Sequence, residues 1–509
     1  MLRPNLRSMP FPIWLWIMSV FLPLGWLPLF DVDEGAFSEA TREMLQSGNY
    51  LTTYLYGVLR FDKPILIYWL QALSAHLFGL TTWAMRLPSA CVSSLWLWAM
   101  YRFVLQVYGS ATAWRAVWLF VAAIQISIIA KTAIADALLN TTLVVSMFSF
   151  WWYLKKKEHV DLYTAFFAMG LGVLAKGPIA LLIPLGVISL YALSYAQSHL
   201  FVNSFLNMRA WGVFLLIALP WYVLEWFDQG WLFIDGFFLT HNVNRALSAM
   251  ESHQGAWWYY IPVVIFGLCP FSGFLYPVLR QVQSIWQQDV ERFLWIWVCF
   301  VLGVFSCVST KLPHYVIYAY TPLIILMARY AKEQWHHSLY MLPALILWGV
   351  FSLLPWLFSW IASTSHDPAL LAIAPGISKY FALDYQIVLH VPSLVVLYIW
   401  YQDRWRDIRH ALVACWCLGF VHIVFLPRLV NVLQRPVYDA AMLAKSMGDD
   451  VVMYRMHTPS FAFYSGLNVT RAQPQAGNLV LTRSWYQQDF AHVEIIYSQY
   501  GVVLLRLLK

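Results

Sequence analysis

Apolar runs of about 20 residues recur along most of this chain, and they constrain its fold more than any other feature. A helix of that length can cross the hydrocarbon core of a bilayer. The composition agrees, because 61% of the 509 residues are hydrophobic and only 11% are charged, whereas soluble domains carry roughly 25% charged residues. A soluble fold could not hide so much apolar surface from water. The sequence therefore predicts an integral membrane protein.

The runs predict an all-α polytopic fold with about 13 transmembrane helices. Their approximate limits are 11–30, 87–107, 113–130, 137–154, 162–175, 178–196, 210–226, 257–279, 293–309, 314–330, 338–363, 384–401 and 411–427. If the N-terminus is cytoplasmic, the cytoplasmic ends collect most of the nearby lysines and arginines, as the positive-inside rule requires. The net charge is only +7, and no basic stripe alternates with aromatic residues. Nucleic acid is therefore not an expected partner.

The same threading divides the chain into a transmembrane domain, residues 1–427, and a tail, residues 428–509. The long segment 31–86 falls on the extracytoplasmic side, and its apolar stretches are short enough for helices that lie along the membrane surface. The tail is more polar and alternates stretches typical of strands and helices. We expect it to form a small α/β domain on the extracytoplasmic side.

Three polar clusters fall at the outer ends of predicted spans. Residues 31–34 hold three carboxylates, which repel one another unless a cation is near, although a solvated acidic loop is the plain alternative. Asp62 and Lys63 are adjacent; the lysine suits a phosphate, or the two form a surface ion pair. Asp136 stands where one span ends and the next begins, and an ionisable group at membrane depth is costly. It is a functional candidate or a helix N-cap.

Further polar residues fall on the same side. Lys176 precedes the helix-breaking Gly-Pro pair and could also be a membrane-surface anchor. The loop 241–253 contains His241, Arg245 and His253, which offer metal-binding or proton-carrying imidazoles and a phosphate-binding guanidinium. Lys311 lies in another outer turn, and it is either an anion ligand or a lysine that anchors the chain at the membrane interface. If these groups had no common role, they should occur on both faces. An anionic, lipid-linked substrate at this interface would explain both their location and the excess of cations.

Several of these motifs, together with neighbouring residues and taken in order, resemble a known family. They are Asp33-Glu34-Gly35, Arg42-Glu43-Met44, Ser47-Gly48-Asn49-Tyr50, Phe61-Asp62-Lys63-Pro64, Leu174 to Pro178, the His/Arg loop with Trp258-Tyr259-Tyr260, and Lys311-Leu312-Pro313. The combination resembles the bacterial aminoarabinose transferases, which belong to the GT-C glycosyltransferases beside the protein O-mannosyltransferases. The resemblance extends from residue 1 to about residue 330, while the tail resembles the family only in position and size.

The resemblance implies a GT-C fold and roles for individual residues. Asp33 and Asp136 match the acidic catalytic candidates, Asp33 as general base or acceptor ligand. The phosphate of the donor would meet four residues, which are Lys63, Arg245, Lys311 and Tyr315. Asp62 matches a metal-ligand position that usually holds Glu, and either His241 or His253 would complete a divalent-metal site. No organic cofactor is implied.

The family takes a sugar from a polyprenyl phosphate, such as undecaprenyl phosphate, and places it on an acceptor in the periplasm, commonly lipid A. The resemblance therefore implies a monomeric enzyme of the bacterial inner membrane that transfers a pentosyl or hexosyl group from such a donor to lipid A or another envelope lipid or glycan. Ala36 and Phe37 replace the Arg and Tyr common in the family, and Asp62 is one methylene shorter than Glu. These departures leave the sugar unassigned.

Two other functions are alternatives. A transporter or flippase of lipid-linked sugars should have interrupted helices around a midplane site, whereas the candidates here fall at one face. A protein O-glycosyltransferase would use the same donor chemistry with a different acceptor.

Overall fold

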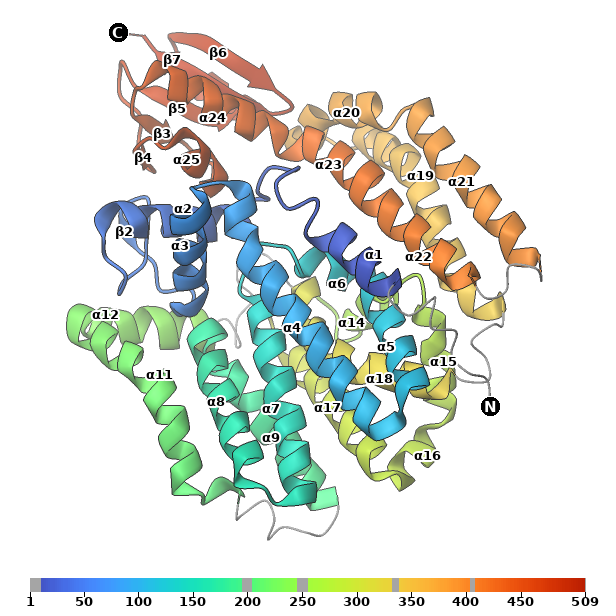
Figure 1. The fold of residues 1–509 in the computed structure, drawn as a ribbon. Helices are drawn as coiled ribbons and strands as arrows, with labels where there is room; N and C mark the ends of the chain where they lie inside the picture. Colours follow the sequence, from blue (N-terminus) through green and yellow to red (C-terminus); the bar gives the residue numbers. More distant parts are fainter. Residues whose placement is uncertain (1–10, 195–203, 245–254, 332–337, 403–407, 509) are drawn as a thin grey trace. The chain divides into compact units, whose positions relative to one another are not determined.

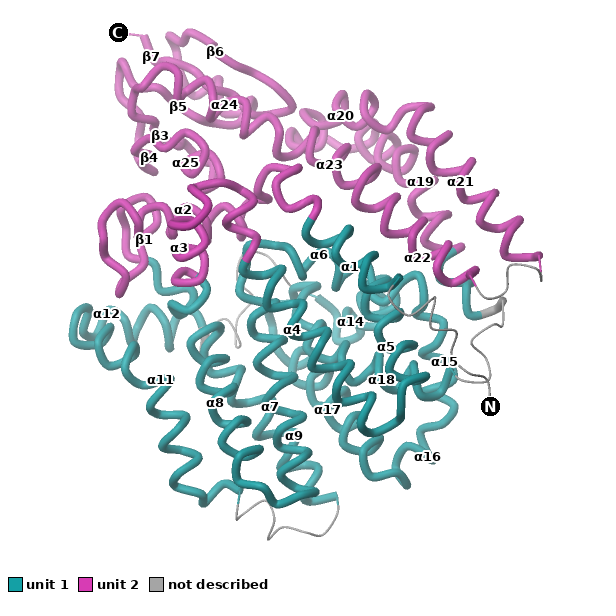
Figure 2. Tube along the Cα trace, viewed as in Figure 1, with its two compact units in different colours: residues 1–21, 60–67, 88–344 teal, residues 22–59, 68–87, 345–509 magenta. Residues whose placement is uncertain are grey.

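The structure, a computed structural model, describes residues 11–194, 204–244, 255–331, 338–402 and 408–508. It is mainly helical, as the sequence predicts (Figure 1). The chain forms two compact units, drawn in different colours in Figure 2. Unit 1 comprises residues 1–21, 60–67 and 88–344, and unit 2 comprises residues 22–59, 68–87 and 345–509. We describe each unit by itself.

Unit 1 is a bundle of helices joined mostly by short turns. Its helices are α1 (Phe11–Val20), most of α4 (Thr82–Tyr108), α5 (Ser110–Ala122), α6 (Ile124–Ile129), α7 (Asp136–Lys156), α8 (His159–Lys176), α9 (Ile179–Ser194), α11 (Met208–Gln229), α12 (Trp231–Phe233), the π-helix η2 (Ile234–Asn244), α14 (Tyr260–Gly267), α15 (Leu275–Arg280), α16 (Val282–Gln287), α17 (Asp289–Cys307), the 3-10 helix η4 (Pro313–Ala319) and α18 (Tyr320–Tyr330). Helices α7, α8 and α9 pack side by side (Figure 1). Aromatic side chains fill the contact between α7 and α8, where the buried rings of Phe150 and Phe166 lie 5.7 Å apart between their centres.

Unit 2 combines three parts. The first is helix α2 (Asp33–Ser47), the hairpin β1 (Tyr54–Leu55) and β2 (Val58–Leu59), and helix α3 (Leu66–Phe78). The second is a set of apolar helices, α19 (Leu342–Thr364), α20 (Pro368–Tyr380), α21 (Leu383–Tyr401), α22 (Arg409–Gly419), the π-helix η7 (Phe420–Phe425) and α23 (Leu426–Leu433). The third is the tail, which alternates helices and strands as predicted.

The tail is a five-stranded mixed sheet with the order β4-β3-β5-β7-β6. Its elements are α24 (Arg435–Met447), β3 (Val451–Met453), α25 (Pro459–Ser465), β4 (Val469–Thr470), β5 (Leu479–Arg483), β6 (Val493–Gln499) and β7 (Val502–Leu507). Strand β3 runs parallel to β4 and β5, while β7 is antiparallel to β5 and β6. Helix α24 packs against β7, and its small side chains Ala440 and Ala444 share a buried core with Val502 and Leu504 of that strand.

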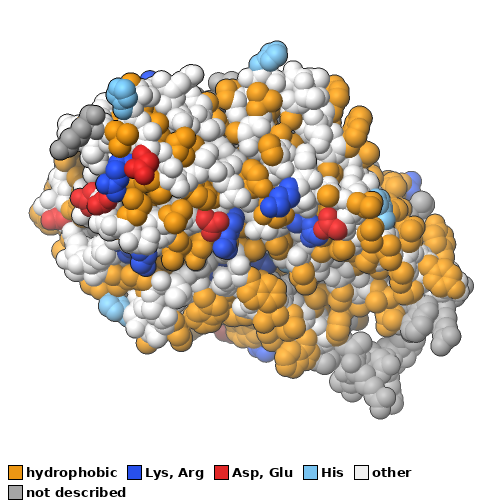
Figure 3. Space-filling view, turned by 90° about the horizontal axis from the view of Figure 1, so that it is seen from above, with side chains coloured by type: hydrophobic (Ala, Val, Ile, Leu, Met, Phe, Trp, Pro, Cys, Tyr) orange, Lys and Arg blue, Asp and Glu red, His pale blue; other side chains and the backbone are white. Residues whose placement is uncertain are grey.

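The tail contains three partly exposed ion pairs, Arg435–Asp439, Arg455–Asp489 and Arg506–Asp449. Figure 3 shows one face of the molecule on which most acidic side chains lie next to basic ones. Such pairs contribute little to stability because water screens them.

Seven described helices are long and apolar enough to span a membrane: α4, α7, α11, α17, α19, α21 and the continuous helix 409–433. Three shorter apolar helices are α1, α3 and α9. These helices confirm a multi-pass membrane protein. The count of about 13 spans stays a prediction, because length and composition identify seven.

Several predicted spans are interrupted. The run 113–130 divides into α5 and α6, because Ala123 is extended and the Ile124 N–H donates to the Cys269 carbonyl instead of continuing the helix. The runs 257–279 and 314–330 contain prolines and divide into short α and 3-10 pieces. Hydropathy does not detect such breaks, because every piece is equally apolar.

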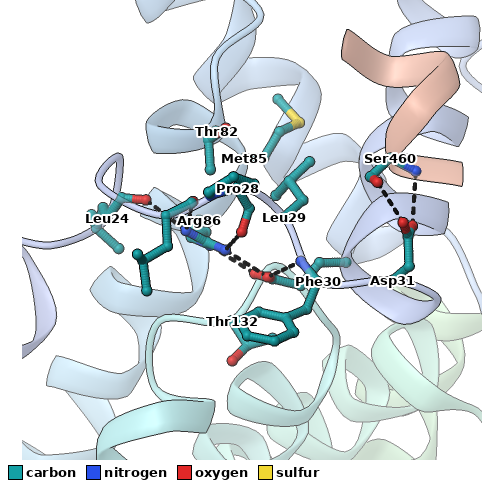
Figure 4. Close-up of polar contacts among 12 residues, drawn as sticks. Leu24, Pro28, Leu29, Phe30, Asp31, Thr82, Met85, Arg86, Thr132 and Ser460 are labelled. Atoms are coloured by element: carbon teal, nitrogen blue, oxygen red, sulfur yellow. Dashed lines mark hydrogen bonds and ion pairs between the residues drawn. The ribbon is translucent and has the colours of Figure 1, made fainter. Parts of the chain in front are cut away.

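One buried arginine organises the N-terminal part of unit 2 (Figure 4). All five N–H donors of Arg86 are engaged: two meet the carboxylate of Glu34 at 2.7 and 2.8 Å, and three meet the carbonyls of Leu24, Leu27 and Pro28. The Glu34 carboxylate also accepts from the Phe30 N–H at 2.9 Å. Arg86 therefore fixes the chain that leads into α2.

We expect Arg86→Ala to destabilise the fold strongly, because it leaves the carboxylate of Glu34 buried without a counter-ion, a change that costs about 3–5 kcal/mol. The matched control is Arg435→Ala, which removes one exposed pair with Asp439 and should cost less than about 1 kcal/mol. Thermal unfolding of the purified variants in detergent measures both. Equal melting temperatures for the two variants would contradict the role given to Arg86.

Candidate active site

A cavity of about 140 Å³ in unit 1 gathers most of the described polar candidates. It is lined by Asp62, Lys63, Lys176, Ile179, Phe237, His241, Phe305, Val308, Tyr315 and Tyr318. The polar groups come from the loop before residue 65, the end of α8, the π-helix η2 and the 3-10 helix η4. The other walls are aromatic and aliphatic. Such a cavity offers both charged contacts and an apolar surface to one ligand.

The innermost group of this site is a buried ion pair. Asp136 is 3% exposed at the first turn of α7, and its Oδ1 accepts from Lys176 Nζ at 2.6 Å and from the Tyr318 hydroxyl at 2.7 Å. Lys176 Nζ also donates to the Tyr318 oxygen at 2.8 Å. His314 Nε2 lies 3.9 Å from the same carboxylate oxygen. The pair fixes the ammonium group of Lys176 at the cavity wall.

The chain places Lys176 there because α8 ends abruptly. Gly177 has a φ of 79°, which side chains other than glycine rarely adopt, and proline follows it. A Cβ at Gly177 would lie 2.8 Å from Cζ of Phe237, which lines the cavity. Glycine therefore lets η2 approach the end of α8.

Asp62 forms a second charged group at the cavity. Its Oδ1 lies 2.8 Å from His241 Nε2 and its Oδ2 lies 3.0 Å from a guanidinium nitrogen of Arg60. Burial raises the pKa of Asp62, but the hydrogen bond with His241 and the positive charges of Arg60 and Lys63 outweigh it and hold the pKa below its usual range. The carboxylate is therefore charged at neutral pH. The π-helix that presents His241 is of a kind often found at functional sites.

Lys63 lies beside this carboxylate. It is half-buried and donates to the backbone carbonyl of Asp62 at 2.9 Å. Around the cavity, the cations Arg60, Lys63 and Lys176 stand against the two carboxylates of Asp62 and Asp136, so the lysine, arginine and aspartate charges sum to a positive value. This balance favours an anionic ligand.

Lys311 occupies a different place from the other cations. It is 6% exposed, and its Nζ donates to the carbonyls of Ser306 and Val308 at 2.8 and 2.9 Å. These carbonyls belong to the C-terminal end of α17, where a positive charge is stabilising. Tyr315 lines the cavity, whereas Lys311 is not among its lining residues.

Asp33 belongs to unit 2, where it is exposed at the first turn of α2. Its neighbour Asp31 accepts from the backbone N–H of Ser460 at 2.8 Å and from the Ser460 hydroxyl (Figure 4). Burial raises the pKa of Asp31 to about 7, against the lowering effect of these hydrogen bonds. The three carboxylates of residues 31–34 thus have different surroundings, and Asp33 is the exposed one.

The predicted metal site has two described members. Asp62 and His241 meet, whereas Arg245 and His253 lie outside the described residues. Within the described part of the chain, no group of three or more His, Cys, Asp or Glu side chains is placed to hold a metal ion. The described residues therefore do not fit a complete metal site by themselves.

Sequence reasoning did not select Tyr318, His314 or Arg60 as site residues, and it left Lys176 undecided. Lys176 had a signal, since a lysine beside a Gly-Pro break inside apolar sequence is uncommon. Tyr318 had none, because it is one of 29 tyrosines in a chain rich in aromatic residues. Arg60 could have been noticed as a third charge next to Asp62 and Lys63.

Known proteins share the part of the chain that supplies several residues of this site. A family model described as dolichyl-phosphate-mannose-protein mannosyltransferase matches residues 62–224, which include Asp62, Lys63, Asp136 and Lys176. In sequence, the chain is 30% identical to undecaprenyl phosphate-alpha-4-amino-4-deoxy-L-arabinose arabinosyl transferase 1 of Proteus mirabilis over 327 residues. That match covers 62% of this chain and 58% of the relative, so it spans less than two thirds of the relative's length. A relative from Aeromonas hydrophila, named as an arabinosyl transferase of the same kind, is 29% identical and is covered over 69% of its length, against 70% of this chain.

The fold matches over nearly the whole chain. The crystal structure of ArnT from Cupriavidus metallidurans bound to undecaprenyl phosphate superposes with a TM-score of 0.82 at 18% identity, covering 99% of this chain and 98% of that one. The chain therefore has the fold of that membrane protein. In sequence it is similar to the arabinosyl transferases named above and, over residues 62–224, to the protein mannosyltransferase family.

Gly177→Ala should disturb the cavity, because the new Cβ meets Phe237 and the backbone at φ 79° disfavours alanine. We expect a loss of about 1–3 kcal/mol in stability. Gly212→Ala in α11 is the control, since its Cβ meets nothing within 4 Å, and alanine should stabilise that helix by up to about 1 kcal/mol. Thermal unfolding of both variants tests this. A Gly177→Ala protein as stable as wild type would show that the close approach of η2 is not required.

Proposed function

We propose that the protein is a glycosyltransferase that moves a sugar from a polyprenyl phosphate to an acceptor at the periplasmic face of the bacterial inner membrane. One observation supports the proposal most directly: Lys63 and Lys176 line the same cavity, and its other walls are aromatic and aliphatic. A lipid phosphate has matching parts, an anionic group and an apolar chain. The names of the relatives cited above include undecaprenyl phosphate, which supports a lipid phosphate as the ligand.

In this proposal the cavity stabilises the leaving group. The bond between the anomeric carbon and the phosphate oxygen breaks, and its electron pair stays on the lipid phosphate. Fixed cations at Lys63 and Lys176 stabilise that developing charge without having to reorganise. Asp136 acts as a positioning residue, because its carboxylate and the Tyr318 hydroxyl hold the ammonium group of Lys176 in place. Tyr315 contributes its ring to the cavity wall.

The acceptor hydroxyl forms the new bond to the anomeric carbon and loses its proton. We propose Asp33 as the base that takes this proton, because it is an exposed carboxylate and matches the acidic candidate of the family that the motifs resemble. Arg245 is proposed as a further phosphate ligand, and so is Lys311, whose ammonium group would have to exchange a carbonyl for the phosphate. We also propose that the chain crosses the membrane about 13 times and that the tail, residues 428–509, lies in the periplasm. The enzyme is proposed to be a monomer.

A divalent metal is a separate proposal. Asp62 and His241 would hold it, with His253 as the alternative or additional ligand, and it would supply positive charge near the phosphate. Asp62 is already surrounded by Arg60, Lys63 and His241. No step above therefore depends on a metal.

Two classes of acceptor fit this proposal. Lipid A or another envelope lipid or glycan is our first candidate, because the relatives cited above are named as aminoarabinose transferases and the family that the motifs resemble commonly uses lipid A. A protein acceptor is the second candidate, because the family model matching residues 62–224 is described by protein mannosyl transfer. The transporter alternative is less favoured, since it gives no role to the paired cations at one small cavity.

Lys63→Ala should reduce transfer by about 10²–10³-fold, as expected when one fixed donor to a developing charge is lost. Lys156→Ala is the control: it removes an exposed lysine at the other end of α7 and should leave transfer unchanged. Asp33→Asn should also abolish transfer. The assay uses reconstituted protein with a polyprenyl phosphate sugar, after both variants are shown to be folded and inserted. Normal transfer by Lys63→Ala and Asp33→Asn would remove the catalytic assignment.

Mass spectrometry of cells with and without the protein should reveal the acceptor. We expect one sugar to disappear from lipid A or another envelope glycolipid and the corresponding polyprenyl phosphate sugar to accumulate in its absence. Loss of sugar from periplasmic or membrane proteins instead would favour the protein acceptor. Unchanged glycolipids, glycoproteins and polyprenyl phosphates would contradict transfer of either kind.

A further inference from the structure

Unit 2 contains a second and larger cavity, and the function proposed above does not use it. Its volume is about 720 Å³, within the range of pockets that bind small molecules. One wall is the second half of α2, another is the tip of the β1–β2 hairpin, and the third is the edge strand β4 with the residues just before it. We call it the α2–β4 groove.

The walls of this groove are held firmly. The Glu43 carboxylate accepts from the backbone N–H groups of Tyr56 and Gly57 at 2.6 and 3.1 Å. Both turn residues have positive φ, 57° and 72°, as a two-residue hairpin requires. The Tyr56 ring also packs edge-on against His457 of the tail. The groove is therefore a formed feature of unit 2.

A buried ion pair lies in the α2 wall. Arg42, 6% exposed, donates to both carboxylate oxygens of Glu39 at 2.6 and 2.7 Å, and to the Gln46 side chain at 2.7 Å. Glu39 is 1% exposed. Since Glu39 balances Arg42, the remaining carboxylates Glu43 and Asp450 give the groove a negative charge. An anionic lipid phosphate is disfavoured here, in contrast with the cavity of unit 1.

The groove nevertheless offers many hydrogen-bonding groups. Amides at Gln46 and Asn468 and hydroxyls at Ser47 and Thr470 supply both donors and acceptors, and the half-buried ring of Tyr54 supplies a flat apolar surface. A hydroxyl-rich ring with one apolar face matches that lining. Strand β4 has only two paired residues, which is little for an added peptide strand.

We propose that the α2–β4 groove binds a non-anionic saccharide and that this saccharide belongs to the acceptor. Only the second half of the proposal rests on the proposed glycosyl transfer. The cavity of unit 1 would then hold the phosphate of the donor, while the groove selects acceptors by their sugar.

The first test is binding without any donor lipid. Full-length protein in lipid nanodiscs is mixed with chitobiose, a neutral disaccharide, and saturation-transfer difference NMR detects the bound sugar. We expect a signal with wild type and affinity about two- to tenfold weaker with Tyr54→Ala, which corresponds to an aromatic contact of about 0.5–1.5 kcal/mol. Asn468→Ala should also weaken binding. Glu494→Gln, an exposed carboxylate on β6 outside the groove, is the matched control and should bind as wild type does.

Three results would overturn the groove assignment. One is the absence of saturation transfer from chitobiose at millimolar concentrations. Another is an equal effect of Tyr54→Ala and Glu494→Gln. The third is an extended peptide that binds instead of the sugar and depends on Asn468, which would point to strand addition at β4.

A second measurement separates this proposal from the proposed function. Lys63→Ala should bind chitobiose normally although it has lost transfer. Tyr54→Ala should raise the KM for the acceptor while kcat and binding of polyprenyl phosphate stay unchanged. If wild type and Tyr54→Ala transfer equally and Lys63→Ala does not transfer, the groove does not select the acceptor and the transferase proposal stands. If chitobiose binds but no sugar is transferred, the transferase proposal fails and the saccharide site remains.

Discussion

The buried pair of Asp136 and Lys176 is the interaction on which the site in unit 1 depends. Neither charge could be buried alone among apolar helices, because the cost of desolvation would be several kcal/mol for each. At 2.6 Å and with the Tyr318 hydroxyl in contact with both groups, each charge has its counterpart. The pair joins the start of α7 to the end of α8, which are 40 residues apart in sequence. It therefore determines where the lysine lies and, with Gly177, where η2 can approach.

The two cavities differ in a way that follows from their charges. Around the cavity of unit 1, three cations face two carboxylates, and the remaining walls are apolar. In the α2–β4 groove, three carboxylates face one guanidinium, and the walls are rich in amides and hydroxyls. The positive balance of the first cavity favours a lipid phosphate, and the negative balance of the groove disfavours one. Two substrates that differ in charge would therefore not compete for the same binding groups.

The sequence predicted the features that apolar surroundings make conspicuous. The membrane fold follows from the apolar runs, and Asp62, Lys63 and Asp136 could be selected as candidates because charged residues stand out in apolar sequence. The contact of Asp136 with Lys176 could not be inferred, since many pairings of outer-end charges were equally compatible with the topology. The break at Ala123 depends on a hydrogen bond from Ile124 to Cys269, far away in sequence. Local pattern contains no information about such contacts.

Lys311 shows how the same residue type can meet different demands. A lysine in an outer turn suits a phosphate, and the resemblance to aminoarabinose transferases implied that role. In the structure its ammonium group satisfies carbonyls at the end of α17, which otherwise lack partners at a helix C-terminus. Lys63 lines the cavity, and the carbonyl to which it donates, that of Asp62, does not lie at a helix end. Recruiting Lys311 would instead break hydrogen bonds that cap α17, so Lys63 can turn toward a donor phosphate without opening a helix end.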